Sequence, residues 1–269
     1  MSLQYYYNDI DLLSQLYDTP NSYSMIGINI KAAGDTYTIR KEISVERENA
    51  DIYLCENTEG RKFIIKYFRN IIPRANIGYG IYNHFGRGRD GSRSVFDEIR
   101  QESALREFIV KHYERVRYEG SWLIVMEFIE GVDLRDFMVR NYSTSLNKVL
   151  AAIRALAETM ATWHNHGFAH GDPHLENAIL QTLDDQSYAV KLIDYSQLHF
   201  KEFEYCKYYK CFSTDPLRRI REDLENPFHG KLGRGFRCDI QAVQQELGAD
   251  STMIACFDET YRRSIQFHL

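Results

Sequence analysis

His170-Gly171-Asp172-Pro173-His174-Leu175-Glu176-Asn177 is the stretch that decides the fold of this chain, together with Leu192-Ile193-Asp194-Tyr195-Ser196 further on. The first stretch reads H-G-D-x-x-x-x-N, and the second is an apolar run that ends in an aspartate and two polar residues. Taken singly, an Asp-Pro pair indicates a turn and an asparagine indicates a cap. Together, these residues indicate a site where a reaction takes place. Asp172 is an acceptor for the proton of a hydroxyl group, and Asn177 and Asp194 supply the hard oxygen atoms that magnesium prefers.

The sequence between the two stretches predicts a β-hairpin. Ala178-Ile179-Leu180 and Ala189-Val190-Lys191-Leu192-Ile193 are strand-like, and the polar turn Asp184-Asp185-Gln186 lies between them. Asn177 and Asp194 therefore fall at loop positions beside the two strands, where a metal site can form. His170 is expected to brace the loop rather than to react.

The composition indicates a globular chain with a sizeable core. The chain has 269 residues, of which 44% are hydrophobic, enough for one large domain or two small lobes. The formal net charge of −5 and the pI near 6.0 argue against a bulk nucleic-acid binder. No apolar signal core opens the chain, and no window approaches the roughly 20 apolar residues of a membrane span. We therefore expect a cytoplasmic protein, for which peripheral contact with the inner membrane face stays open.

The cysteines favour reduced thiols over a disulfide framework or a zinc site. They are odd in number and lack C-x-x-C spacing. The five are Cys55, Cys206, Cys211, Cys238 and Cys256.

The first part of the chain predicts strands. A short helix and loose strands are expected before residue 40, then strands over 43–45, 51–55 and 62–68. Lys66 lies late in the last of these strands, and taken alone it is a solvated lysine. The loop 46–50 contains two glutamates and no glycine. The Gly- and Arg-rich segment 69–93 is either a solvated loop or a contact for an anionic substrate or a membrane surface.

Residues Ser94–Tyr113 are predicted to form a helix. Their apolar positions recur near helical spacing, at Val95, Ile99, Leu105, Phe108 and Ile109. Of the three glutamates on this segment, Glu98, Glu102 and Glu107, we prefer Glu102 as a functional residue because Leu105 and Ile109 keep it beside the buried face. Any of the three can instead be solvated.

The second half of the chain predicts helices. An apolar strand over Trp122–Met126 runs into the linker Glu127–Gly131. The next helix is expected to start over Asp133–Arg140, with Asp133 near its N-cap. A long amphipathic helix follows over Leu146–His166. The Tyr-, Lys- and Arg-rich segment 205–221 is either a basic rim for an anionic acceptor or a solvated helix face. Asp239 lies in a further helix that begins near Phe236, and is a candidate brace for the loop around Asp172.

These motifs resemble the protein kinase-like superfamily over about residues 43–245. The resemblance rests on Lys66, the segment with Glu102, Phe128-Ile129-Glu130-Gly131-Val132-Asp133-Leu134, the Gly171–Asn177 loop and Ile193-Asp194-Tyr195-Ser196. Within the superfamily the chain looks most similar to bacterial heptose and Kdo kinases of the lipopolysaccharide core. Gly171 and His174 stand where protein kinases usually have Arg and Lys, and Tyr195-Ser196 replaces Phe-Gly with no Ala-Pro-Glu after it. Aminoglycoside and choline kinases share the H-G-D-x-H style.

The resemblance implies an α+β, two-lobed protein kinase-like fold. An antiparallel-sheet N-lobe would cover residues 1–130, and a mostly helical C-lobe residues 131–269. ATP and magnesium are the implied cofactors. Lys66, held by Glu102, would contact the phosphates, and Asp172 would orient the acceptor hydroxyl. Backbone groups of Glu127 and Ile129 would hold adenine, Asp133 would reach the ribose or cap its helix, and Asn177 and Asp194 would bind the metal.

The acceptor implied by the resemblance is an anionic sugar or glycolipid of the lipopolysaccharide core, at the inner face of the cytoplasmic membrane. The alternatives are a protein Ser/Thr/Tyr kinase, an aminoglycoside- or choline-type kinase, and a pseudokinase that binds a partner without turnover. The pseudokinase alternative rests on the glycine-free loop, because protein kinases place glycines there to approach phosphate. The presence of Lys66, Asp172, Asn177 and Asp194 together favours an enzyme.

Overall fold

The computed structural model divides into two compact units, one containing strands β1–β6 and the other containing all elements from β7 onward. It describes residues 25–32, 34–45, 50–68, 102–118, 121–184, 187–194, 199–200 and 234–266. Within these residues, no helix is both long and apolar enough to cross a membrane.

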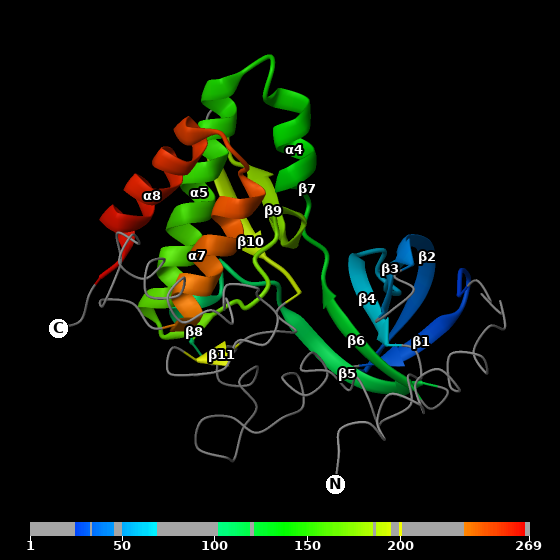
Figure 1. Ribbon diagram of the computed structural model, residues 1–269. Helices are drawn as coiled ribbons and strands as arrows, with labels where there is room; N and C mark the ends of the chain where they lie inside the picture. Colours follow the sequence, from blue (N-terminus) through cyan, green and yellow to red (C-terminus); the bar gives the residue numbers. More distant parts are fainter. Residues whose placement is uncertain are drawn as a thin grey trace, which may run out of the picture. The chain divides into compact units, whose positions relative to one another are not determined.

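The first unit is one antiparallel sheet that curls on itself (Figure 1). Its strands are β1 (Asn29–Ala32), β2 (Asp35–Val45), β3 (Ala50–Glu56), β4 (Lys62–Phe68), β5 (His112–Tyr118) and β6 (Ser121–Glu127), in the order β1-β2-β3-β4-β6-β5. Every second residue of a strand faces the same side. Ile65 on β4, Tyr53 on β3 and Val125 on β6 therefore share the core face, where Phe63 packs edge-on against Tyr37 at 4.9 Å between ring centroids. The strands predicted over 43–45, 51–55 and 62–68 are confirmed.

The helix predicted over Ser94–Tyr113 is wrong within its described part, residues 102–113. Only a 3-10 turn, Ser103–Leu105, is present there, and β5 begins at His112. The apolar spacing misled because Leu105 and Ile109 are both buried, as they would be on one face of a helix. The backbone of this segment instead makes hydrogen bonds with a distant segment. Leu192 N donates to Phe108 O at 3.1 Å, and Ile109 and Leu192 form an isolated parallel β-bridge.

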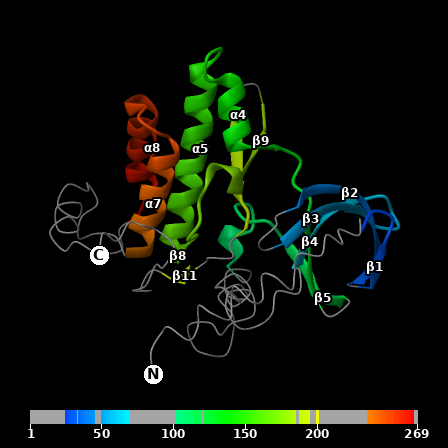
Figure 2. The ribbon, with the colours of Figure 1, turned by 45° about the vertical axis from the view of Figure 1, so that its right-hand side comes forward.

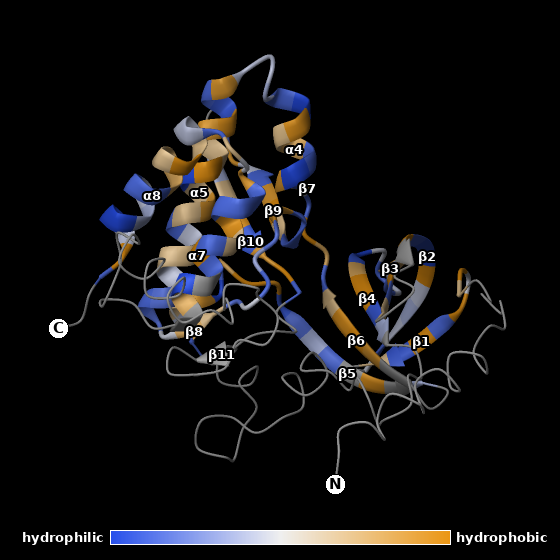
Figure 3. Ribbon diagram, viewed as in Figure 1, coloured by the Kyte–Doolittle hydropathy of each residue, from blue (hydrophilic) through white to orange (hydrophobic). Residues whose placement is uncertain are grey.

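Helix α5 (Leu146–Asn165) is the centre of the second unit. It packs against α4 (Leu134–Asn141) and α8 (Ser251–Ser264), and α7 (Arg234–Glu246) lies beside them (Figures 1 and 2). The predicted helical stripe is fully buried, at Val149, Ile153, Leu156, Met160 and Trp163. Figure 3 shows apolar residues gathered along α5 and polar ones toward the C-terminal end of α8. The helices predicted near residues 134, 146–166 and 236 are confirmed.

Two small sheets complete the unit and position the motif residues. The first contains β10 (Tyr188–Leu192), β9 (Ala178–Thr182) and β7 (Val132–Asp133), in that order, and β9 and β10 form the predicted antiparallel hairpin. The second pairs β8 (Phe168–Ala169) with β11 (His199–Phe200). The H-G-D-x-x-x-x-N stretch therefore runs from the end of β8 to the start of β9.

Candidate active site

The loop from His170 to Asn177, called the catalytic loop below, is a sharply turned segment. Gly171 has φ 83°, a left-handed conformation that glycine adopts without a Cβ clash. The loop closes with a 3-10 turn over Leu175–Asn177, and Asn177 N donates to His174 O at 2.8 Å. Gly171, read from the sequence as a marker of acceptor class, thus also has a backbone role.

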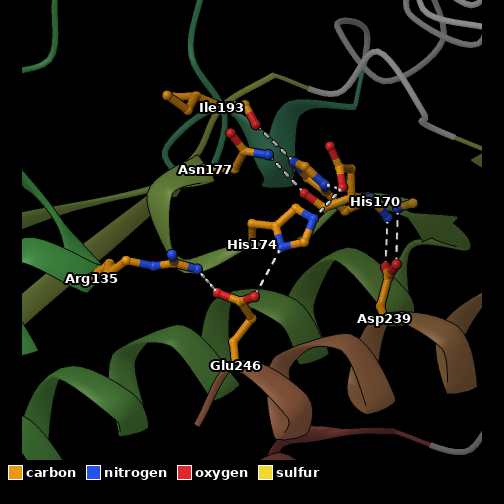
Figure 4. Close-up of polar contacts among 9 residues, drawn as sticks. Arg135, His170, His174, Asn177, Ile193, Asp239 and Glu246 are labelled. Carbon is orange, nitrogen blue, oxygen red and sulfur yellow. Dashed lines mark hydrogen bonds and ion pairs between the residues drawn. The ribbon is translucent and has the colours of Figure 1, made fainter. Parts of the chain in front are cut away.

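Asp239 on α7 binds the backbone at the start of this loop. Its carboxylate accepts from His170 N at 2.6 Å and from Gly171 N at 2.9 Å (Figure 4). Asp239 is fully buried, so these amides have a charged acceptor that is shielded from water. The prediction that Asp239 braces the loop is confirmed.

The support beneath Asp239 extends to two residues that the sequence reading missed. His164 Nε2 lies 3.2 Å from Asp239 Oδ2, and His164 Nδ1 lies 2.6 Å from the hydroxyl of Tyr261. Phe236 stacks on the His164 ring at 4.2 Å between centroids. A carboxylate only accepts, so Nε2 carries the hydrogen and the Tyr261 hydroxyl donates to Nδ1. Burial and the charge of Asp239 raise the pKa of Tyr261.

His170 ties the loop to the end of the hairpin, as predicted. Its Nε2 donates to Ile193 O at 2.9 Å, and its Nδ1 accepts from Asp172 N at 3.2 Å (Figure 4). Both contacts are met by the neutral ring with its hydrogen on Nε2. Trp163 of α5 packs against the ring at 5.4 Å between centroids. His170 therefore sets the position of Asp172 relative to Asp194, the residue after Ile193.

The hairpin places the two predicted metal ligands next to each other in the fold. Asn177 precedes β9 and Asp194 follows β10, and Ile193 N donates to Asn177 O at 2.8 Å. The Asn177 side-chain amide donates from Nδ2 to Asp172 O at 2.9 Å, which orients Oδ1 as the group that can face a cation. Asp194 has φ 55°, a conformation that is uncommon outside glycine and recurs at functional sites. An amide oxygen and a carboxylate suit magnesium, which takes one or two protein ligands and completes its shell with water and phosphate.

Asp172 lies between these supports, on the exposed side of the loop. Its side chain is 32% exposed, and His174 Nε2 lies 3.0 Å from its Oδ1. A partly exposed carboxylate with fixed neighbours can receive a substrate hydroxyl without a rearrangement of the loop.

Lys66 lies at the centre of the other unit, on β4. It pairs with Ile52 on one side and Ile124 on the other, and its side chain is only 6% exposed. The alternative of a solvated lysine is therefore wrong. The strand alternation places Lys66 on the sheet face opposite the core residue Ile65. A lysine is rarely buried to this extent without a partner or a function.

Glu102 occupies the N-cap position of the 3-10 turn without a side-chain capping hydrogen bond, and its carboxylate lies 3.7 Å from His166 Nδ1. Lys66 and Glu102 belong to different units, and their predicted pairing stays a prediction. Glu127 ends β6 opposite Phe63. Asp133 is the N-cap of α4, with Oδ1 accepting from Asp136 N at 2.7 Å, so the capping role given as one alternative is present.

Some predicted features lie outside the described residues. They are the loop 46–49, the segment 69–93, Glu98, Tyr195-Ser196 and the basic segment 205–221.

Comparisons with known proteins find kinases that resemble parts of this chain. The family model described as protein kinase domain matches residues 84–207, which contain the catalytic loop and Asp194. The chain is 30% identical over 87 residues to the serine/threonine-protein kinase DCLK3 of Mus musculus, covering 32% of this chain and 11% of the relative. It is 29% identical over 156 residues to AarF domain-containing protein kinase 1 of Xenopus laevis, covering 55% and 29%. It is 32% identical over 72 residues to the serine/threonine-protein kinase cds1 of Schizosaccharomyces pombe, covering 27% and 16%.

These matches, with the curled antiparallel sheet and the separate helical unit, confirm the predicted fold class. They also support the predicted kinase class and its use of ATP and magnesium. The chain spans less than a third of the length of each of these relatives.

Proposed function

We propose that the chain is a member of the protein kinase-like superfamily and that it transfers the γ-phosphate of ATP to a hydroxyl group in a magnesium-dependent reaction. One observation carries the proposal. The catalytic loop holds Asp172, Asn177 and the residue before Asp194 in one hydrogen-bonded arrangement, through His170 and the Asn177 side chain.

The roles of these residues follow from their surroundings. Asp172 orients the acceptor hydroxyl and receives its proton as the new phosphate ester forms. Asn177 Oδ1 and the Asp194 carboxylate would hold magnesium, which when bound would neutralise charge on the phosphate oxygens. Because the Asn177 amide also binds Asp172 O, one side chain couples the metal position to the position of the base.

Nucleotide contacts come from the strands and the linker after them. Lys66 binds the α- and β-phosphates, with Glu102 as its proposed partner. Backbone groups of Glu127 and Ile129 hold the adenine. Asp133 would reach the ribose in addition to capping α4. The near-complete burial of Lys66 supports this role, because burying a lysine ammonium group costs free energy unless an anion lies close to it.

For the acceptor we propose a sugar hydroxyl of an anionic glycolipid, of which the lipopolysaccharide core is the best fit to the motifs. Gly171 and His174 in the catalytic loop support this choice. It implies a cytoplasmic protein that meets the inner membrane face peripherally. A protein hydroxyl is the second candidate, because the relatives include proteins named serine/threonine-protein kinases.

Turnover of magnesium-ATP tests the proposal. Asp172→Asn should lower turnover by about 10²–10⁴-fold, the usual contribution of a general base, and should keep the thermal shift produced by magnesium-ATP. Asp194→Asn should lose the magnesium-dependent part of that shift. Asp136→Asn, at an exposed position on α4, is the matched control. Wild-type protein that shows neither turnover nor a magnesium-dependent shift would support the pseudokinase alternative instead.

The acceptor is tested with two probes in parallel, dephosphorylated lipopolysaccharide core oligosaccharide and casein. Label from γ-phosphate in the oligosaccharide supports the glycolipid proposal. Label only in casein supports a protein kinase.

A further inference from the structure

His174 lies between two carboxylates that come from different parts of the chain. Its Nε2 is 3.0 Å from Asp172 Oδ1, and its Nδ1 is 3.2 Å from Glu246 Oε1 (Figure 4). Asp172 is in the catalytic loop, and Glu246 is the last residue of α7. Both ring nitrogens therefore lie within ion-pair distance of carboxylate oxygens, and the contact of Nδ1 with Glu246 is also a hydrogen bond.

Glu246 is itself held in place. Its Oε2 is bound by Arg135, near the start of α4, and Arg135 Nη1 also lies 3.0 Å from Glu176 in the catalytic loop. The hydrogen bond with Glu246 raises the pKa of Arg135. The Glu246 side chain is only 19% exposed, less than any other member of this set. The series Asp172–His174–Glu246–Arg135 thus joins the loop to two helices, α4 and α7.

Each contact in this series has one partner, His174 or Arg135, whose side chain is 44% exposed, and ion pairs that are open to water contribute little to stability. Their effect lies in orientation. A carboxylate on a loop rotates about two side-chain bonds, and fixing Oδ1 through His174 restricts the direction of the Asp172 carboxylate toward an acceptor.

We propose that His174 is the positioning residue for Asp172, and that Glu246, held by Arg135, fixes the orientation of the His174 ring. The inference rests on the phosphotransfer proposed above, in which Asp172 is the base. It concerns a contact of the base that does not involve the nucleotide.

The kinetic test uses magnesium-ATP turnover of the full chain. His174→Ala should lower kcat by about 10- to 100-fold, the scale of a base misplaced by about 1 Å, with the KM for ATP changed less than twofold. Glu246→Gln should give a smaller loss in the same direction. His174→Gln should recover part of kcat, because its amide nitrogen can occupy the place of Nε2, whereas His174→Asn should not.

The decisive comparison is made in the Asp172→Ala background. If His174 acts through Asp172, adding His174→Ala to Asp172→Ala should change kcat by less than twofold. A purely structural role of His174 would give its full loss in both backgrounds, and that result would overturn the proposal. Glu259→Gln, in an exposed ion pair with Arg263 on α8, is the control for Glu246→Gln and should match wild type.

A crystal structure of His174→Ala decides the matter without any activity. The proposal expects the Asp172 carboxylate to rotate or to occupy more than one position. An unchanged Asp172 in that structure would overturn it, whether or not the wild type turns over ATP. Absence of turnover in the wild type would instead count against the proposed function.

Discussion

Replacing Asp239 by alanine should destabilise the helical unit and abolish the order of the catalytic loop. The wild-type carboxylate accepts from His170 N at 2.6 Å, from Gly171 N at 2.9 Å and from His164 Nε2 at 3.2 Å. All four residues are buried, so the alanine variant leaves three donors without their acceptor in a site shielded from water.

The magnitude follows from these three contacts. A buried donor that loses its partner costs about 1–3 kcal/mol, so three would cost about 3–9 kcal/mol if nothing relaxed. Water entering the space left by the carboxylate recovers part of this. We expect about 3–5 kcal/mol for Asp239→Ala, the scale seen when one partner of a buried pair is removed. Asp239→Asn keeps one acceptor oxygen and should cost about 1–3 kcal/mol.

Urea unfolding followed by tryptophan fluorescence measures these costs. The chain has two tryptophans, and a Trp122→Phe background leaves Trp163, which is buried on α5, as the only reporter of the helical unit. Asp136→Asn in the same background should stay within about 0.5 kcal/mol of the parent, as exposed substitutions do. A loss below about 1 kcal/mol for Asp239→Ala would refute the reasoning, because it would mean that the loop amides find equal partners elsewhere.

Three further predictions concern stability, each measured as the thermal midpoint against wild type. Asp250→Ala should lower it, because Asp250 caps α8 by accepting from two backbone amides. The Tyr142 hydrogen bond lowers the pKa of Asp250, so the contribution is complete above the ordinary aspartate pKa and is lost as pH falls below it; a difference that grew in acid would contradict this. Burial raises the pKa of Asp258, so its ionised form opposes folding at neutral pH. Asp258→Asn should raise the midpoint at pH 7, with a gain that vanishes in acid below the ordinary aspartate pKa, and an equal gain at both pH values would exclude the charge as the cause. Gly131→Ala should cost about 1–3 kcal/mol, because its Cβ would meet Leu180 O at 2.5 Å; an unchanged midpoint would show that β9 can yield.

Local patterns were sufficient to predict much of the fold and the catalytic loop. The hairpin around residues 178–193 follows from two short apolar runs and a polar turn, and the loop motif places Asn177 and Asp194 at its open end. The long helix α5 follows from apolar residues that recur at helical spacing, and all of them are buried. These features depend on residues close in sequence, which is why they can be read without a structure.

The misassigned helix and the missed supports depend on contacts between distant segments. Residues 102–113 have helical apolar spacing, yet Phe108 and Ile109 pair with Leu192 far along the chain. Glu246 reaches His174 across a sequence separation of 72 residues. Tyr261 and His164 gave one weak signal, since a polar residue on the apolar stripe of an amphipathic helix needs a buried partner. Nothing in the sequence names that partner.

The supports of the catalytic loop form two sets that should respond differently to substitution. Asp239, His164 and Tyr261 are buried, so losing any one leaves unsatisfied groups that cost stability first. His174 and Arg135 are each 44% exposed, so water replaces their lost contacts at little cost in stability. A variant of the first set should therefore lose turnover together with a large fall in its thermal midpoint, whereas His174→Ala should lose turnover with its thermal midpoint nearly unchanged. Turnover and stability measured on the same variants thus separate residues that hold the loop together from the residue that directs its carboxylate.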